Sequence, residues 1–263
     1  MEDFLAKAQA VAVAAAKEAG KVLMLHFRHQ LSIEFKGGSI RNLVTNADRA
    51  ADSIIQKRIR KAFPGHGIAS EESAPTDGEY VWHIDPLDGT TNYSRGSNQF
   101  CVAIGLRRGK QLLVGVVYNP VASELYTAIT GRGAFLNGKR IAVSEVPKLN
   151  SSIVYCDMGY EDNERKKMLQ ILNGIAFHVK SIRCRGCGAL TTADVAAGRA
   201  DCYLRAASTP WDYTASTVIL REAGGMVTDL KGKGWHPYTV DGIVATNSKI
   251  HKDTLKKIAE ALR

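Results

Sequence analysis

The chain has 263 residues, of which 45% are hydrophobic and 23% charged, so it can bury a substantial core in one large domain or two tightly packed ones. Its formal net charge of +9 would suit nucleic acid, membrane headgroups or phosphorylated substrates. The Lys and Arg residues are scattered in short groups, and no helix-turn-helix, zinc-finger or aromatic RNA-binding pattern accompanies them, which argues against nucleic acid as a partner.

The N-terminus shows no targeting pattern. It starts Met-Glu-Asp, without the basic segment of a secretory signal, and the apolar run at 10–16 is too short to cross a bilayer. Five dispersed cysteines favour reduced thiols. Together these features predict a cytoplasmic protein that does not enter the membrane.

Two helices are expected in the first quarter of the chain. Apolar residues at helical spacing predict a helix over 4–27, followed by a short strand at 31–35 and a polar, glycine-containing loop at 36–42. Thr45 is a suitable N-cap for a second helix that runs to about residue 63, and Asp48, three residues later, completes a capping-box pattern. A capping role would by itself explain Asp48.

Strands predominate between residues 67 and 141. An apolar run at 67–70 leads into Glu71 and Glu72, and a strand that ends in two carboxylates can present one to a metal and the other to solvent. An acidic pair of this kind is more often a solvated loop. Apolar and alternating runs separated by turn residues predict further strands at 80–85, 100–107, 112–118, 124–129 and 134–141.

The segment from residue 82 to 93, Trp-His-Ile-Asp-Pro-Leu-Asp-Gly-Thr-Thr-Asn-Tyr, is the most informative part of the sequence. Its proline and glycine are expected to bend the backbone sharply, so that Asp85, Asp88 and the hydroxyl of Thr90 converge. Two crowded carboxylates repel each other, and a hard divalent cation with oxygen ligands relieves the repulsion. The hydroxyl could hold a water molecule beside that cation, so the segment predicts a metal-dependent hydrolytic site.

Two other interpretations of this segment need to be weighed. Asp-Pro and Asp-Gly pairs are frequent in plain turns between strands. Haloacid-dehalogenase-type phosphatases have a similar string, with a nucleophilic aspartate two residues before the second aspartate. That position is Pro86 in this chain, which offers no nucleophile, so this class of phosphatase is excluded.

From about residue 151 the expected strands alternate with helices, as in an α/β unit. The predicted strands lie at 153–156, 179–183, 202–204, 226–228 and 243–245, and the predicted helices at 162–174, 188–198, 211–224 and 250–262. No flexible linker separates this part from the first. A boundary near residues 146–147 would therefore divide two packed halves, 1–147 and 148–263.

Two local patterns in the C-terminal half have simple structural explanations. Cys184 and Cys187 form a Cys-x-x-Cys, which could bind zinc or undergo redox chemistry, but no second pair follows and the neighbouring glycines suit a tight turn into a helix. Thr209 and Pro210 are typical of a helix N-cap and first helical position, and Asp212 would complete a capping box without any metal.

Considered jointly, these motifs resemble the inositol monophosphatase family. The resemblance rests on Glu-Glu-Ser at 71–73, Asp-Pro-Leu-Asp-Gly-Thr at 85–90 and Pro-Trp-Asp at 210–212. It is extended by Val-Thr at 44–45 with Asp48, by the glycine-rich run at 131–138, and by Glu-Ala-Gly-Gly at 222–225 with Thr-Asp at 228–229. The motifs occur in order over nearly the whole chain. The resemblance implies an α/β protein with layered α/β/α/β/α packing and a homodimer.

The resemblance also implies a chemistry and a set of site residues. The activity would be Mg²⁺-dependent, lithium-sensitive hydrolysis of a phosphate monoester, with most metal ligands in the N-terminal half. Two or three Mg²⁺ ions would be held by Glu71, Asp85, Asp88, Asp212 and the backbone carbonyl of Leu87. All of these donors are oxygen atoms, which suits Mg²⁺ rather than zinc.

Water would attack phosphorus directly, without a phosphoenzyme. By the same resemblance, Thr90, hydrogen-bonded to Asp48, would orient that water together with Glu71. The phosphate would meet the backbone N–H groups of Gly89, Thr90 and Thr91 at a helix start. Lys36 and Glu72 are two further candidates. The loop from Lys36 to Asp48 looks one residue longer than is common in the family.

Substrate choice depends on positions where this chain departs from the family. The family recognises its polyol through residues after Gly186 and through an acidic side chain seven residues before Asp212. Those positions are Cys187, Gly188 and Arg205 in this chain. An arginine removes an acceptor for ring hydroxyls and supplies a fork suited to a second phosphate, unless it simply faces solvent in a loop.

The predicted substrate is therefore a small phosphorylated polyol or sugar, with inositol 1-phosphate as the first candidate. Fructose 1,6-bisphosphate and adenosine 3′,5′-bisphosphate are the alternatives. A hypothesis of a different class is a basic interaction protein of RNA or the transcription machinery, built on the same scaffold. The intact set of metal ligands argues against it, and a salt-sensitive affinity for RNA without phosphatase activity would favour it.

Overall fold

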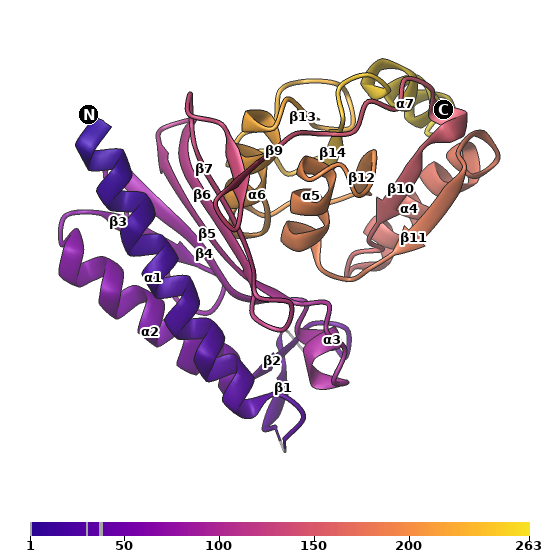
Figure 1. Cartoon of the computed structure of the whole chain (residues 1–263). Helices are drawn as coiled ribbons and strands as arrows, with labels where there is room; N and C mark the ends of the chain where they lie inside the picture. The colour runs from indigo at the N-terminus through magenta and orange to yellow at the C-terminus, as the bar shows by residue number, and fades with distance from the viewer. Residues whose placement is uncertain (1, 30, 37–38) are drawn as a thin grey trace.

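Two β-sheets separated by a pair of helices form the centre of the molecule (Figure 1). The computed structural model describes residues 2–29, 31–36 and 39–263. One outer layer is formed by α1 (Glu2–His26) and α2 (Asn46–Ala62), the middle layer by α5 (Gly188–Ala196) and α6 (Pro210–Glu222), and the other outer layer by α4 (Asp162–Ile175) and α7 (His251–Ala261). The predicted α/β/α/β/α layering is confirmed.

The first sheet has seven strands in the order β3-β4-β5-β6-β7-β8-β9. Its strands are β3 (Gly67–Ser70), β4 (Tyr80–Asp88), β5 (Cys101–Arg108), β6 (Gln111–Asn119), β7 (Glu124–Ile129), β8 (Ala134–Leu136) and β9 (Lys139–Ile141). All neighbours are antiparallel except β3 and β4, which run parallel. Helices cover both faces, which explains why β5 is an unbroken apolar run rather than an alternating one.

The second sheet has five strands in the order β11-β10-β12-β14-β13. They are β10 (Ile153–Cys156), β11 (Ser181–Cys184), β12 (Cys202–Arg205), β13 (Met226–Thr228) and β14 (Ile243–Thr246). The first three are mutually parallel and the last two pair antiparallel. The division of the chain into halves at residue 147 stays a prediction.

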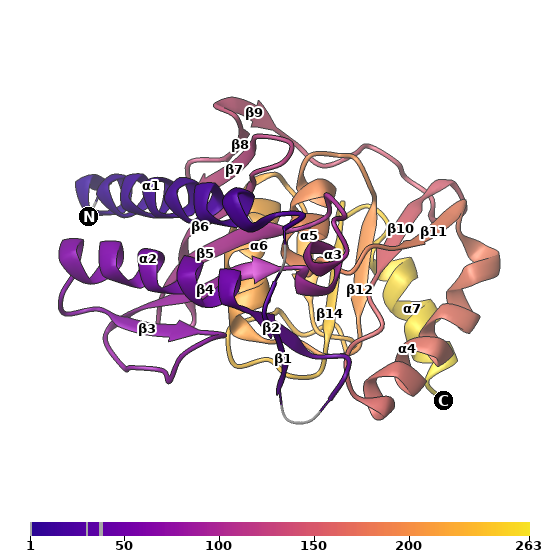
Figure 2. The same cartoon turned by 90° about the horizontal axis from the view of Figure 1, so that it is seen from below.

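The structure differs from the prediction at two places. The run at 134–141 is a hairpin of two short strands, because Asn137 and Gly138 both adopt positive φ angles, of 49° and 78°, and form a tight turn. A strand at Leu43–Thr45, β2, was not predicted; it pairs with β1 (Ile33–Phe35) in a small hairpin that lies beside α3 (Thr90–Ser94) (Figure 2). Three residues directly before a helix are too few to show a strand period.

The predicted helices all form, with ends shifted by at most two residues. Thr45 and Asp48 make the expected capping box at the start of α2. Among the described residues, no helix has the combination of length and apolar character that crossing a bilayer requires.

Helix α6 lies unusually close to the seven-stranded sheet. A Cβ atom on Gly105 would come within 2.5 Å of the Thr214 methyl, and one on Gly115 within 2.2 Å of the Ala215 carbonyl. These two glycines in β5 and β6 therefore let the helix rest directly on the strands. The close contact brings Asp212, in the first turn of α6, to the end of β4.

Candidate functional site

The site begins where β4 ends. Pro86 lies within the strand, in an irregularity between Asp85 and Asp88 where the pairing with β5 shifts register. The expected sharp turn occurs only at Gly89, with φ of 91°, where a Cβ atom would come within 2.7 Å of the Gln99 carbonyl. The bulge and the left-handed glycine together aim the side chains of this segment toward one end of the sheet.

Three of the predicted carboxylates meet at this end. Ligand oxygens of Glu71, Asp85 and Asp212 all lie within 4.8 Å of one another. They come from the end of β3, from β4 and from the first turn of α6, and the parallel pairing of β3 with β4 places the first two side by side. The pKa of Asp85 is raised well above its ordinary value, first by burial and then by the charges of Glu71, Asp88 and Asp212. Such a group favours a cation, and its all-oxygen donors fit Mg²⁺.

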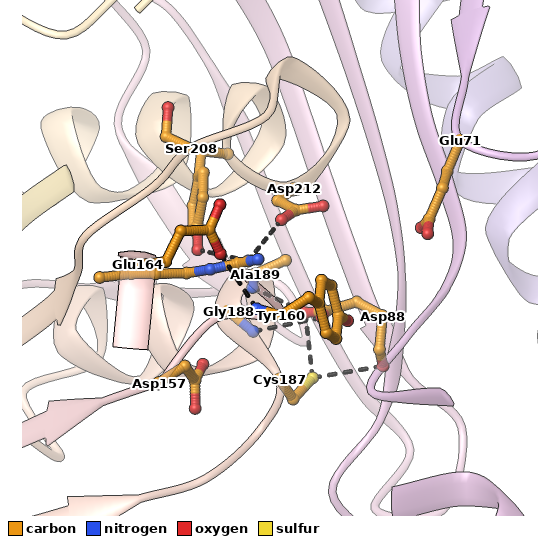
Figure 3. A network of polar contacts seen from close by, with 12 residues as sticks. Glu71, Asp88, Asp157, Tyr160, Glu164, Cys187, Gly188, Ala189, Ser208 and Asp212 are labelled. Carbon is orange, nitrogen blue, oxygen red and sulfur yellow. Dashed lines mark hydrogen bonds and ion pairs between the residues drawn. The ribbon is translucent and has the colours of Figure 1, made fainter. Parts of the chain in front are cut away.

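Asp88 is not one of these three carboxylates. Its carboxylate accepts hydrogen bonds from the backbone N–H groups of Gly188 at 3.2 Å and Ala189 at 2.7 Å, at the start of α5. The Cys187 thiol lies 3.0 Å from the same carboxylate (Figure 3). Burial, with a contribution from Asp212, raises the pKa of Asp88 to about 7.

The backbone of Leu87 links Asp85 to Thr90. Its backbone N–H donates to Asp85 Oδ1 at 3.0 Å, and its carbonyl accepts from the Thr90 hydroxyl at 3.0 Å. The carbonyl predicted to bind metal is thus directed into the site, beside the hydroxyl.

Asp48 caps α2 and also contacts the Thr90 hydroxyl. Its Oδ2 accepts from the Thr45 backbone N–H at 2.8 Å, which completes the cap of α2, while its Oδ1 lies 3.3 Å from the Thr90 hydroxyl. Burial raises the pKa of this carboxyl to about 7. A capping residue can therefore also be part of the site, because its two oxygens face different partners.

Lys36 and Glu72, the two additional candidates, lie next to Glu71. The Lys36 ammonium is 2.8 Å from Glu71 and 2.5 Å from Glu72. Burial alone would lower the pKa of Lys36, but the two carboxylates outweigh it and the pKa is raised. Gly37 and Gly38, in the loop that looked one residue long, lie outside the described residues.

The predicted capping box at the start of α6 is wrong. Thr209 is the N-cap residue and Pro210 follows it as expected, but the Thr209 side chain makes no capping hydrogen bond, and Asp212 accepts from Arg205 at 2.8 Å. Arg205 also lies 3.2 Å from the Tyr213 hydroxyl and 5.4 Å from the centre of the Tyr160 ring. The solvent-facing alternative for Arg205 is also wrong, since only 9% of the residue is exposed.

Two adjoining cavities open onto these residues. The smaller, of about 310 Å³, is lined by Glu71, Asp85, Leu87 and Asp212, and the larger, of about 670 Å³, extends toward three further arginines. Both are bordered by the same five residues, namely Asp88, Gly89, Thr90, Tyr160 and Arg205. The predicted metal ligands thus lie in one cavity, and a substrate could extend into the other.

Some of the residues predicted to contact the substrate line these cavities, and one does not. Thr91 and Gly188 line the larger cavity. Cys187 is only 1% exposed and lines neither cavity, because its thiol faces Asp88.

The sequence reasoning missed Asp157, which directly follows β10. Its carboxylate accepts from the Gly186 backbone N–H and from the Tyr203 hydroxyl, and so holds the turn before α5. Its position could have indicated a site residue, because ligands bind at the carboxyl ends of parallel strands.

Adding Mg²⁺ is expected to raise the thermal midpoint of unfolding, and to raise it more at about pH 8 than at about pH 6. The folded pKa values of Asp48 and Asp88, about 7, lie above those of an unfolded chain. Between about pH 4 and 7 the folded state therefore binds more protons, and without metal its stability falls as the pH rises. At the higher pH these carboxylates are already ionised, so a cation binds without having to displace protons, and it stabilises the folded state more.

The measurement is thermal unfolding with Mg²⁺ and with chelator at both pH values. A free concentration of 100 times Kd would add about 2.7 kcal/mol. Asp85→Asn is the matched control and should lose most of the effect. An equal shift in that variant, or a larger shift at the lower pH, would contradict this assignment.

Comparisons with known proteins agree with the geometry. The model of the inositol monophosphatase family matches residues 5–263. The chain is 38% identical to inositol monophosphatase 2 of Solanum lycopersicum, over 99% of this chain and 100% of the relative. It is 36% identical to the Nus factor SuhB of Salmonella typhimurium, over 96% of each. An IMPase structure from Thermotoga maritima superposes with a TM-score of 0.88 at 33% identity, covering 95% of this chain and 96% of that one.

Proposed function

Because this chain belongs to the inositol monophosphatase family and is a phosphoric monoester hydrolase, we propose that it hydrolyses a small phosphorylated polyol or sugar with Mg²⁺, inositol 1-phosphate being the first candidate. The observation that carries the proposal is the meeting of Glu71, Asp85 and Asp212 within 4.8 Å, beside the hydroxyl of Thr90. Lys36 pairs with Glu71 and Arg205 with Asp212, and Asp85 lies buried among these carboxylates, so a cation would offset the remaining negative charge.

The residues that would hold Mg²⁺ are Glu71, Asp85, Asp88, Asp212 and the carbonyl of Leu87. When bound, Mg²⁺ supplies positive charge for the phosphate and lowers the pKa of water. Asp88 would have to serve this role while keeping its hydrogen bonds from the start of α5.

Thr90 is well placed to orient the attacking water. Its hydroxyl has one proton to donate, and two acceptors compete for it, the Leu87 carbonyl and Asp48. A lone pair of the hydroxyl oxygen therefore remains free to accept a proton from water. Asp48, with a pKa of about 7, could in turn accept the threonine proton near neutral pH. Glu71 would orient the same water from the other side.

Turnover in water labelled with a heavy oxygen isotope tests this hydrolytic step. Direct attack by water places one heavy oxygen in each phosphate released and none in the alcohol. Label in the polyol product would reject attack at phosphorus. Burst kinetics with a phosphorylated protein would reject the absence of a phosphoenzyme.

Arg205 favours a second candidate, a substrate with two phosphates. Its guanidinium is held on one side by Asp212 and Tyr213 through Nη1, while Nε makes no hydrogen bond to the described residues. The larger cavity beside it is also lined by Arg41 and Arg165. This concentration of positive charge would suit fructose 1,6-bisphosphate or adenosine 3′,5′-bisphosphate.

Arg205→Glu is expected to lower kcat/KM for a bisphosphate by about 10- to 100-fold relative to inositol 1-phosphate, because a charge-assisted hydrogen bond is lost. The measurement compares all three substrates with the wild-type protein and the variant. Arg205→Gln separates the loss of positive charge from the added carboxylate. An unchanged order of kcat/KM would mean that Arg205 acts only as the ion partner of Asp212.

The remaining expectations come from the family. We propose a homodimer, sensitivity to lithium and a cytoplasmic location. One relative is named a Nus factor, which supports keeping the interaction protein of RNA or the transcription machinery as an alternative. Salt-sensitive RNA binding without phosphate release would favour that alternative.

A further inference from the structure

Two buried cysteines meet behind the Asp88 carboxylate. The Cys101 and Cys187 sulfur atoms are 3.9 Å apart, although the residues are 86 positions apart in the chain. Asp88 Oδ2 lies 3.0 Å from the Cys187 sulfur and 3.7 Å from the Cys101 sulfur. All three ligand atoms lie within 4.8 Å of one another. The Cys-x-x-Cys pattern is therefore not the relevant pair, because Cys187 faces Cys101 rather than Cys184.

These separations are close to those of a tetrahedral thiolate site. With zinc–sulfur bonds of about 2.3 Å and zinc–oxygen bonds of about 2.1 Å, two sulfurs lie about 3.8 Å apart and a sulfur and an oxygen about 3.6 Å apart. Two of the three observed distances already match, at 3.9 and 3.7 Å. Only the contact between Cys187 and Asp88 would have to lengthen, by roughly half an ångström.

The three residues are held by regular structure. Cys101 opens β5 directly opposite Asp88 in β4, and Cys187 is the N-cap residue of α5. The Cys187 thiol makes no capping bond within its own helix, so it is available to Asp88 (Figure 3). The backbone N–H groups of Gly188 and Ala189 also donate to this carboxylate and hold it in place, as partners outside the ligand set commonly do in metal sites.

We propose that Cys101, Cys187 and Asp88 form a binding site for a thiophilic divalent cation of the zinc type. The cation would enter from the cavities that Asp88 borders, displace the two thiol protons to solvent, and keep a water molecule as its fourth ligand. The site differs from the group of Glu71, Asp85 and Asp212 in its donor atoms, and shares only Asp88 with the proposed Mg²⁺ ligands. Its occupation would withdraw Asp88 from them.

Cobalt is a suitable probe, because thiolate bound to Co²⁺ gives a charge-transfer absorption that carboxylate ligands do not. The fully reduced wild-type protein is titrated with Co²⁺, and zinc is then added to displace it. One equivalent of thiolate-bound Co²⁺ is expected. Cys101→Ser and Cys187→Ser should each weaken zinc binding by at least about 100-fold, measured against a competing chelator.

Two control variants make the outcome specific. Cys184→Ser removes an exposed thiol next to the same turn and should leave the spectrum unchanged. Asp85→Asn weakens the other acidic group and should also leave it unchanged. No charge-transfer band in the wild-type protein, or a band that persists in the Cys101→Ser, Cys187→Ser double variant, would overturn the proposal. The binding test needs no phosphatase activity, so its result is independent of the proposed function.

Discussion

Replacing Asp88 with asparagine is expected to lower kcat for phosphate release by at least about 1,000-fold, because about 4 kcal/mol of charge stabilisation is lost with one carboxylate of the metal site. Gly188 and Ala189 donate to different oxygens of Asp88, so the single amide oxygen of asparagine can keep the shorter bond from Ala189 while the longer one from Gly188 is lost. The local structure should persist. Steady-state kinetics with inositol 1-phosphate and saturating Mg²⁺ provide the measurement.

Stability measurements separate a catalytic effect of Asp88→Asn from misfolding. In the absence of metal, the wild-type side chain is a buried carboxyl whose pKa is raised to about 7, so its ionised form is destabilising at neutral pH. The asparagine variant should therefore be at least as stable as the wild-type protein in chelator. Substantial residual kcat in a folded variant would reject Asp88 as a metal ligand.

Replacing Thr90 with valine is expected to lower kcat by about 100- to 10,000-fold with a much smaller change in KM. Valine keeps the shape of the side chain but removes the hydroxyl that lies 3.0 Å from the Leu87 carbonyl and 3.3 Å from Asp48. The attacking water would lose the group that orients it, while the residues proposed to bind metal remain.

Thr90→Ser is the matched control for this prediction. It retains the hydroxyl on a slightly more mobile side chain, and most of kcat should be recovered. A valine variant with nearly full kcat would contradict the role given to Thr90. A serine variant as slow as the valine variant would point to packing of the methyl group instead.

Much of the site could be predicted because its chemistry is concentrated in short segments. Asp85 and Asp88 are three residues apart in one strand, and Glu71 directly follows the strand that pairs with it in parallel. Local rules of capping predicted Asp48 correctly, and its second role followed from the resemblance. Layer order could also be predicted, because helices on both faces of a sheet leave strands such as β5 uniformly apolar.

What could not be predicted depends on packing between distant segments. The Thr209 side chain makes no capping bond, and the Asp212 carboxylate instead binds Arg205, which comes from β12. Cys101 and Cys187 meet only because α5 rests on the ends of β4 and β5. No spacing in the sequence indicates either contact. The turn at Gly89 was expected, but the continuation of β4 through Pro86 and the bulge before the turn required knowledge of how β4 pairs with β5.

Phosphate release from inositol 1-phosphate, measured on the wild-type protein with Mg²⁺ and with chelator, tests the central claim most directly. Fructose 1,6-bisphosphate and adenosine 3′,5′-bisphosphate are measured in parallel, with Asp88→Asn as the inactive reference. We expect release from at least one substrate that requires Mg²⁺ and is absent in the variant. Equal release in chelator, or no release from any of the three, would contradict the proposed metal-dependent hydrolysis of these esters.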